Sequence, residues 1–248
     1  MTATQSQAGQ WTREELEGKI REVAPKLAVF DCDGTLWGGD AGLGFMNWTL
    51  EQGIVSRATA DWIDTRHRAY RAGEVSEVQI CGEMVQIYAG LHDDELQRVA
   101  AQYVREFVQP QVFAEMLALV EELRGHGTEI WAVSSTNKWV ICEGVRMFGI
   151  PEERVLAAEV AIKAGIITSD IVDVPTDDGK AESLRRVGIA RPDAVFGNSI
   201  HDLAMLEIAA HAFPINPSPA LLAAATRNGW GHYRPQAAPL ALSDITGE

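Results

Sequence analysis

Two aspartates separated by one residue are the feature of this chain best suited to chemistry. Asp31 and Asp33 directly follow the apolar run Leu27–Phe30, which predicts a short buried strand. Gly34 ends this strand, so the second carboxylate lies where the chain turns. Two carboxylates at the end of a buried strand are costly unless a positive charge lies between them. In an open α/β sheet that end is also where ligands bind. We therefore expect a divalent cation held by oxygen ligands here.

The run 31–36, Asp-Cys-Asp-Gly-Thr-Leu, resembles the first motif of the haloacid dehalogenase (HAD) superfamily of phosphohydrolases. The resemblance implies that Asp31 is the nucleophile that attacks phosphorus, that Asp33 is the general acid and base, and that Gly34 contacts the substrate. A second acid at the Asp33 position argues against dehalogenation, because a halide leaving group needs no proton. The alternative is an Asp-Gly turn in which the first aspartate only caps a turn or helix.

The segment Thr128–Asn137 resembles the second motif, a strand that ends in a hydroxyl residue. By register with the apolar run, Ser134 is the hydroxyl that would donate a hydrogen bond to a phosphate oxygen, with the loop at Ser135 as a further substrate contact. Ser134 could instead be the N-cap of the next helix, but Ser135, Thr136 and Asn137 lie closer to that helix.

Lys180, at the start of an expected helix, resembles the lysine of the third motif, which pairs with the nucleophilic aspartate and the phosphate. A site that holds several acids and a dianionic ester needs such a cation. The ordinary alternative is a solvated surface lysine. Lys138 and Lys163 are rivals in early-helix and hairpin contexts.

The segment Gly197–Asp202 resembles the fourth motif, usually written Gly-Asp-x-x-x-Asp, which completes a Mg²⁺ site. The first acid is here Asn198, whose amide oxygen can bind Mg²⁺ but adds no charge. Either Asp202 is a direct ligand, or Asn198 is the ligand and Asp202 acts through water. The resemblance thus implies Mg²⁺ bound by Asp31, the Asp33 backbone carbonyl, and Asn198 or Asp202.

Residues 41–109 show helical periodicity almost throughout and follow the glycine-rich segment Gly38–Gly44. A helical cap occupies this place in the phosphoserine-phosphatase-like branch of the superfamily. The resemblance therefore implies an α/β fold: a three-layer, Rossmann-like parallel-sheet core of residues 1–40 and 110–248, with an inserted all-α cap of residues 41–109. Such a lid admits the substrate and then excludes water.

The resemblance places substrate recognition in the cap. Asp40 matches the acid that binds the substrate ammonium in phosphoserine phosphatases, although it could be a turn residue only. The family's carboxylate-binding arginine has no counterpart, because Met84 stands there beside Glu83, and Arg68 and Arg71 lie before the matched segment. A carboxylate would be repelled by Asp40 and Glu83, so we expect a small phosphomonoester without one, with room for an amine or several hydroxyl groups.

Composition restricts the class of protein. The chain has 248 residues, 46% hydrophobic and 23% charged, as in ordinary globular domains. A net charge of −14 argues against nucleic acid and anionic membranes as partners. No apolar run approaches a membrane span, Met1–Gln10 lacks a signal-peptide core, and three scattered cysteines fit a reduced compartment. We expect a cytoplasmic protein that acts on a small phosphorylated metabolite; the oligomeric state is not readable.

The remaining elements follow from local signals. Thr12 and Glu15 form a capping-box signature for a helix over Thr12–Val23. Val155–Ala161 and Gly165–Val172 predict a β-hairpin, and a helix is expected over Ala220–Asn228. The sequence thus predicts a Mg²⁺-dependent phosphatase that forms an aspartyl-phosphate. A phosphotransferase or phosphomutase of the same fold, and a non-catalytic binding protein, remain as alternatives.

Overall fold

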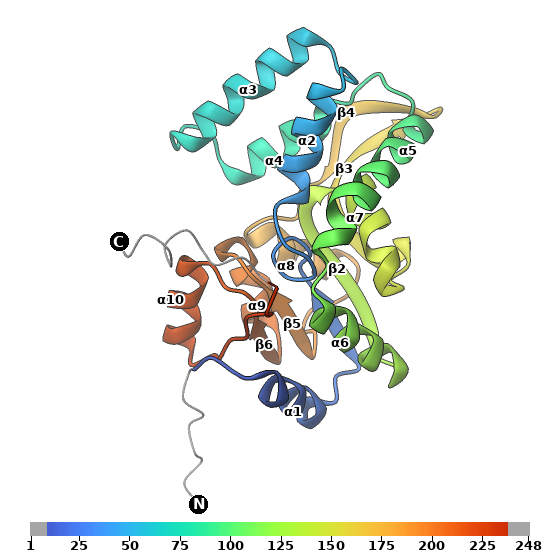
Figure 1. Cartoon of the computed structure of the whole chain (residues 1–248). Coiled ribbons are helices and arrows are strands. Elements are labelled where there is room, and N and C mark those ends of the chain that lie inside the picture. Colours follow the sequence, from blue (N-terminus) through green and yellow to red (C-terminus); the bar gives the residue numbers. More distant parts are fainter. Residues whose placement is uncertain (1–8, 238–248) are drawn as a thin grey trace, which may run out of the picture.

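A six-stranded mixed sheet forms the centre of the computed structural model, which describes residues 9–237 (Figure 1). The strand order is β4-β3-β2-β1-β5-β6. All neighbouring strands pair in parallel except β4, which is antiparallel to β3 at one edge. The α/β, Rossmann-like fold predicted from the sequence is confirmed. The sequence beyond Arg234 has no periodic pattern and predicts a loose tail, most of which lies outside the described residues, as does most of Met1–Gln10.

The elements have the following bounds. The strands are β1 Leu27–Phe30, β2 Glu129–Asn137, β3 Val155–Lys163, β4 Ile166–Asp173, β5 Ala194–Gly197 and β6 His211–Pro214. The longer helices are α1 Arg13–Val23, α2 Ala41–Glu51, α3 Arg57–Arg71, α4 Glu77–Gln86, α5 Asp93–Tyr103, α6 Ala114–Gly125, α7 Lys138–Val145, α8 Asp178–Arg186, α9 Leu203–Ile208 and α10 Pro219–Asn228. Within residues 9–237, no helix is long and apolar enough to cross a membrane.

Helices cover both faces of the sheet, which explains why β1 is a continuous apolar run. Successive side chains of a strand point to opposite faces. Ala28 and Phe30 therefore belong to the larger apolar cluster, with residues of α1, α6 and α7, whereas Val29 packs with residues of α8, α9 and α10. A parallel strand that is buried on both faces needs apolar residues at every position. The result is a rigid strand that ends at the two aspartates.

The chain leaves and re-enters the sheet region through two adjacent segments. The backbone N–H of Gly38 donates to the carbonyl of Gln111 at 2.9 Å, and that of Phe113 donates to the carbonyl of Leu36 at 3.0 Å. Between these points the chain forms α2 to α5, followed by a short π-helical turn, Val104–Val108. The helical structure expected for residues 41–109 is therefore present, and both connections of α2 to α5 to the sheet lie just beyond Asp31 and Asp33.

The β3–β4 hairpin supports these helices, which the expectation of an all-helical unit did not include. The hairpin itself forms as predicted. Its outer part pairs with the loop between α4 and α5: Ile167 donates to the carbonyl of Leu91 at 3.0 Å, and Asp93 donates to that of Gly165 at 3.0 Å. Helix α4 packs against β3 and β4 (Figure 1). Helix α4 therefore packs on the β3–β4 hairpin, which extends the sheet, and apolar hairpin residues such as Val160 and Ile167 are buried.

Candidate functional site

A buried lysine lies between two buried carboxylates at the carboxyl end of the sheet. The Nζ atom of Lys180 is 2.7 Å from Oδ1 of Asp31 and 2.5 Å from Oδ1 of Asp202. Their side chains are only 2%, 7% and 1% exposed, respectively. The rival lysines lie elsewhere, because Lys138 pairs with Glu159 and Lys163 with Asp170. The structure therefore brings together the first, third and fourth motifs.

The charges of this trio do not balance. Burial and the neighbouring carboxylate of Asp202 raise the pKa of Asp31 to about 7, although Lys180 acts in the opposite direction. Burial lowers the pKa of Lys180, but the carboxylates of Asp202 and Asp31 outweigh it and raise that pKa above its ordinary value. Lys180 therefore stays charged, and one negative charge is left over. A site with this excess favours an additional cation.

Three donors fix the carboxylate of Asp33. Its Oδ1 accepts hydrogen bonds from Nε1 of Trp37 at 2.6 Å and from the backbone N–H of Ala41 at 2.9 Å, and its Oδ2 accepts one from the hydroxyl of Thr136 at 2.7 Å. Burial and the nearby carboxylate of Asp40 raise the pKa of Asp33 to about 6. A carboxyl group with this pKa, held in one orientation, suits general acid–base chemistry near neutral pH.

Ser134 is buried at the end of β2, and its Oγ accepts a hydrogen bond from the backbone N–H of Thr136 at 3.1 Å. Since that bond uses a lone pair, the hydroxyl proton remains available for a ligand. The N-cap of α7 is Asn137, whose Oδ1 accepts from the N–H of Val140 at 3.0 Å. Ser134 thus has no capping role. Ser135, next to it, lines a cavity described below.

Asn198 and Asp202 occupy different positions in the fourth-motif loop. Asp202 uses both carboxylate oxygens inside the protein, since Oδ1 pairs with Lys180 and Oδ2 accepts the N–H groups of Asn198 and Ser199 at 2.8 and 2.9 Å. The Asn198 side chain instead lies against Gly34, where an added Cβ would be 1.9 Å from its Nδ2. This arrangement favours Asn198 over Asp202 as a direct ligand, and it shows Asp202 ordering the loop rather than reaching a ligand through water.

The donor atoms fit a hard cation such as Mg²⁺. Residues 9–237 contain no group of three or more His, Cys, Asp or Glu side chains able to hold a metal. The available oxygens are of mixed type: the carboxylate of Asp31, the backbone carbonyl of Asp33 and the side-chain amide of Asn198, in loops that Gly34 and Asn198 hold in contact. Mg²⁺ is commonly held by one or two carboxylates with other oxygens and waters, which this set can provide.

A cavity of about 180 Å³ lies between the helical segment and the end of β2. It is lined by residues of α2, α3, α4 and β2, namely Asp40, Gly42, Leu43, His67, Tyr70, Arg71, Glu77, Ile80, Cys81, Met84, Val85, Tyr88, Ser135, Thr136 and Asn137. Asp40 caps α2 by accepting the N–H of Leu43 at 2.8 Å, and it also lines this cavity. Burial raises the pKa of Asp40.

Glu83 lies outside this cavity. Its carboxylate accepts two hydrogen bonds from the guanidinium of Arg66, both at 2.8 Å. The guanidinium thus balances the charge of this carboxylate with two parallel hydrogen bonds. The structure thus groups the other substrate-contact candidates around the aspartates and the cavity, and leaves Glu83 apart from them.

Sequence reasoning missed the side chains that hold the two aspartates. Besides Trp37 and Thr136 on Asp33, the hydroxyl of Thr35 donates to Oδ2 of Asp31 at 2.8 Å. Thr35 and Thr136 lie inside the first and second motifs, so their hydroxyl groups were a usable signal. Trp37 gave no such signal, because its indole reaches Asp33 only through the turn that follows Gly34.

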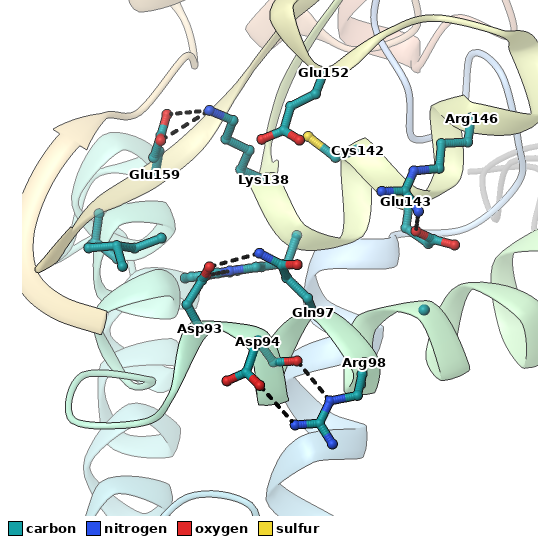
Figure 2. Close-up of a pocket in the computed structure, with 14 residues that line it drawn as sticks. Asp93, Asp94, Gln97, Arg98, Lys138, Cys142, Glu143, Arg146, Glu152 and Glu159 are labelled. Carbon is teal, nitrogen blue, oxygen red and sulfur yellow. Dashed lines mark hydrogen bonds and ion pairs between the residues drawn. The ribbon is translucent and has the colours of Figure 1, made fainter. Parts of the chain in front are cut away.

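A second hollow, of about 490 Å³, lies between α5, α7 and β3 (Figure 2), and neither Asp31 nor Asp33 lines it. Figure 2 shows that most of its charged side chains are paired with each other: Lys138 with Glu159, Arg98 with Asp94, and Arg146 with Glu143. Exposed pairs of this kind are ordinary features of a protein surface. We therefore place the functional site at the aspartates and the smaller cavity beside them.

Known proteins resemble this chain in sequence and in fold. The sequence profile of the haloacid dehalogenase-like hydrolases matches residues 28–207. A probable phosphatase of Mycobacterium tuberculosis is 23% identical over 238 residues, covering 93% of this chain and 82% of its own. A histidinol-phosphatase of Neisseria meningitidis is 22% identical over 215 residues, covering 82% and 96%. A substrate-bound phosphoserine phosphatase superposes with a TM-score of 0.58 at 16% identity, covering 90% of this chain and 97% of its own.

Proposed function

The chain belongs to the haloacid dehalogenase-like hydrolases, and we propose that it is a Mg²⁺-dependent phosphatase that hydrolyses a small phosphomonoester through an aspartyl-phosphate at Asp31. The observation that carries this proposal is the buried contact between Lys180 and Asp31. Two residues further along the chain, Asp33 is held in one orientation and has a raised pKa. The probable phosphatase and the histidinol-phosphatase among the relatives support the same reaction class.

In the first step, a carboxylate oxygen of Asp31 attacks phosphorus and the bond from phosphorus to the ester oxygen breaks. Lys180 lies within hydrogen-bonding distance of Asp31 and can contact the phosphoryl oxygens as charge develops on them, and the free proton of Ser134 provides a second donor. Asp33, protonated, donates its proton to the leaving alkoxide. The alcohol departs, and Asp31 carries the phosphoryl group.

In the second step, the aspartyl-phosphate is hydrolysed. Asp33 is now ionised and takes a proton from the water that attacks phosphorus, so that Asp31 is released together with inorganic phosphate. The three hydrogen bonds from Trp37, Ala41 and Thr136 keep the carboxylate of Asp33 in one place during both proton transfers. The residue returns to its initial protonation state at the end of the cycle.

Asp31, the Asp33 carbonyl and Asn198 would hold Mg²⁺, with Asp202 ordering the loop that carries Asn198. When bound, the ion neutralises charge on the phosphate and polarises its oxygens. The excess negative charge of the Asp31, Lys180 and Asp202 trio supports its binding. The free state of Cys32, Cys81 and Cys142 supports a reducing, cytoplasmic location.

Residues 41–109 would act as the cap over a core of residues 1–40 and 110–248. The paired segments at Gly38 and Gln111 provide one joint at which the helices connect to the sheet. The cavity between the helices and β2 would receive the alcohol part of the ester, next to Thr136, which also holds Asp33. Asp40 would bind an amine or hydroxyl group of this small phosphorylated metabolite.

Removal of Mg²⁺ is expected to abolish phosphate release. The test measures phosphate from a panel of phosphomonoesters with Mg²⁺ and with EDTA, followed by re-addition of Mg²⁺. Asn198→Asp adds a negative charge to the proposed ligand set, so we expect half-maximal activity at a Mg²⁺ concentration about 10-fold lower. Asn198→Ala removes the oxygen and should raise that concentration. Activity that survives EDTA, or an unchanged Mg²⁺ requirement in Asn198→Asp, would contradict this metal assignment.

Asp40→Asn is expected to move the alkaline limb of the pH profile to lower pH. Asp33 must be protonated to donate its proton, so kcat/KM with an alkyl phosphate falls as the pH rises through the pKa of Asp33. Burial and Asp40 both raise this pKa, and the substitution removes the second contribution. Asparagine also caps helices well, so α2 should persist. Asp64→Asn, at an exposed position, serves as control. An alkaline limb of Asp40→Asn that stays in place or moves to higher pH would refute the effect of Asp40 on the pKa of Asp33.

A further inference from the structure

The two carboxylate oxygens of Asp33 differ in the number of hydrogen bonds that they accept. Oδ1 accepts two, from the indole N–H of Trp37 at 2.6 Å and from the backbone N–H of Ala41 at 2.9 Å. Oδ2 accepts one, from the hydroxyl of Thr136 at 2.7 Å. Each carboxylate oxygen has two lone pairs. Both lone pairs of Oδ1 are therefore in use, whereas Oδ2 keeps one that can carry a proton.

The partners of the two oxygens also lie in different surroundings. Thr136, the partner of Oδ2, lines the cavity at the end of β2, whereas Trp37, the partner of Oδ1, is completely buried. A proton on Oδ2 is thus carried by the oxygen whose partner borders the cavity, where the alcohol part of the ester is proposed to bind. A proton on Oδ1 would instead have to displace one of two donors.

Trp37 is held both at its backbone and at its ring. Its carbonyl accepts the N–H of Gly34 at 2.7 Å and closes the turn that follows Asp33. Its indole packs against Phe148, with 6.2 Å between the ring centroids, and against α7 at Gly144. Because packing locks the indole, its N–H is a fixed donor that selects one orientation of the carboxylate.

Gly144 provides the space that the indole occupies. A Cβ atom at this position would be 2.9 Å from Cη2 of Trp37, which is closer than two such carbon atoms can approach. Glycine is less favourable than alanine inside a helix, yet Gly144 lies within α7. The close approach of the indole explains why a glycine stands there.

On the basis of the proposed phosphatase function, we infer that Trp37, seated against Gly144, is a positioning residue that keeps Oδ1 of Asp33 occupied and so directs proton transfer through Oδ2. In the first step the Oδ2–H bond breaks, the hydrogen bonds to the leaving ester oxygen, and Asp33 is left as a carboxylate. In the second step Oδ2 takes a proton from the attacking water, whose oxygen forms the new bond to phosphorus. The indole N–H stays on Trp37 throughout.

Esters with different leaving groups test this inference. An alkyl phosphate needs a proton on its departing oxygen, whereas p-nitrophenyl phosphate releases a stable nitrophenolate without one. Trp37→Phe keeps an aromatic ring and removes the N–H. We expect kcat/KM to fall about 10-fold or more for the best alkyl phosphate of the panel, and less than about 2-fold for p-nitrophenyl phosphate. Equal losses on both esters, or no loss on either, would overturn the inference.

Trp131→Phe is the matched control for this variant. The indole N–H of Trp131 also donates to a carboxylate oxygen at 2.6 Å, but the acceptor is Glu129 at the start of β2. We expect Trp131→Phe to leave the ratio of kcat/KM for the two esters unchanged. A change in this ratio as large as that of Trp37→Phe would overturn the inference, because it would follow from the loss of any indole.

Gly144→Ala tests the seat of the indole without altering Asp33 or Trp37. The added methyl group pushes on the indole, so this variant should also lose kcat/KM selectively for the alkyl phosphate. Gly18→Ala is its matched control, since Gly18 lies within α1 and has open space where the Cβ would be added. Equal kcat/KM ratios in Gly144→Ala and wild type would overturn the role of the seat.

An NMR measurement tests the contact without turnover. Of the signals from the seven tryptophan indoles, that of Trp37 is the one missing in Trp37→Phe. Asp33→Asn replaces the charged acceptor by a neutral amide, which weakens the hydrogen bond, so this signal should move upfield. It should stay in place in the exposed Asp64→Asn. An indole signal that Asp33→Asn leaves unmoved would overturn the inference.

Asp33→Asn also separates this inference from the proposed function. A selective loss on alkyl phosphates in Asp33→Asn, but not in Trp37→Phe, would leave the phosphatase standing and reject the role of Trp37. Equal losses on both esters in Asp33→Asn would reject Asp33 as the acid, and the inference with it. Trp37→Phe added to Asp33→Asn should cause no further selective loss, because the indole acts only through Asp33.

Discussion

Asp31→Asn is expected to lower kcat by roughly 10⁴-fold or more, the range found when an enzyme loses its nucleophile. An amide oxygen does not form the acyl phosphate, so the first step stops. The fold should persist, because asparagine has the same shape and leaves Lys180 paired with Asp202 alone, which removes the excess negative charge.

Phosphate release and thermal unfolding, measured on the same protein samples, test both parts of this prediction. The exposed Asp64→Asn serves as a control for the loss of one acid elsewhere on the surface. A variant that folds and retains a tenth or more of wild-type kcat would show that Asp31 is not the nucleophile. A melting temperature equal to or above that of wild type would confirm that one carboxylate balances Lys180 better than two.

Lys180→Met is expected to cause the largest loss of stability. Removing the ammonium leaves the carboxylates of Asp31 and Asp202 buried beside each other, and breaking a buried ion pair from one side costs about 3–5 kcal/mol. For a chain of this size, that corresponds to a fall in melting temperature of roughly 6–20 °C. Activity should also be lost, since Lys180 is the proposed donor to the phosphoryl oxygens.

The stability that Lys180→Met loses relative to wild type should increase as the pH rises. The pKa of Asp31 is already raised in the folded state, to about 7, and it rises further without Lys180. A carboxyl group whose folded pKa lies above its unfolded value destabilises the fold when it is ionised, so the deficit is largest at pH 8 and shrinks as the pH falls towards 5.

Two variants complete this test. Lys138→Met removes a partly exposed pair with Glu159 and should cost about 1 kcal/mol or less. Lys180→Met/Asp202→Asn removes one of the two unpaired carboxylates and should recover part of the lost stability. A Lys180→Met protein as stable as wild type at pH 8 would contradict the buried pairing of Lys180 with Asp31 and Asp202.

Much of the site was predictable because its residues follow strands with strong local signals. The continuous apolar run of β1 predicts a strand that ends where the polar residues begin, at Asp31. The structure buries this strand on both faces. Parallel strands β1, β2 and β5 carry their loops to one edge of the sheet, which is why segments about 100 residues apart meet there. The resemblance to the third motif correctly selected Lys180 over Lys138 and Lys163 as the lysine beside Asp31.

The rest depends on contacts that local sequence does not specify. The proposed choice of Asn198 rather than Asp202 as a metal ligand depends on the backbone N–H groups that occupy Asp202 and on the close contact of Asn198 with Gly34. The position of α3 beside the cavity depends on how it packs against α4. The support of the helices by the β3–β4 hairpin arises from pairing across more than seventy residues. Each of these is a product of tertiary packing.

Trapping the covalent intermediate tests the central claim most directly. The protein is mixed with Mg²⁺ and a hydrolysed ester, quenched in acid and treated with borohydride, which reduces an aspartyl-phosphate to homoserine, and the peptides are analysed by mass spectrometry. We predict homoserine at position 31, only in samples that contain both Mg²⁺ and ester. Homoserine at another carboxylate, or phosphate release with unmodified Asp31 at every quench time, would contradict nucleophilic catalysis by Asp31.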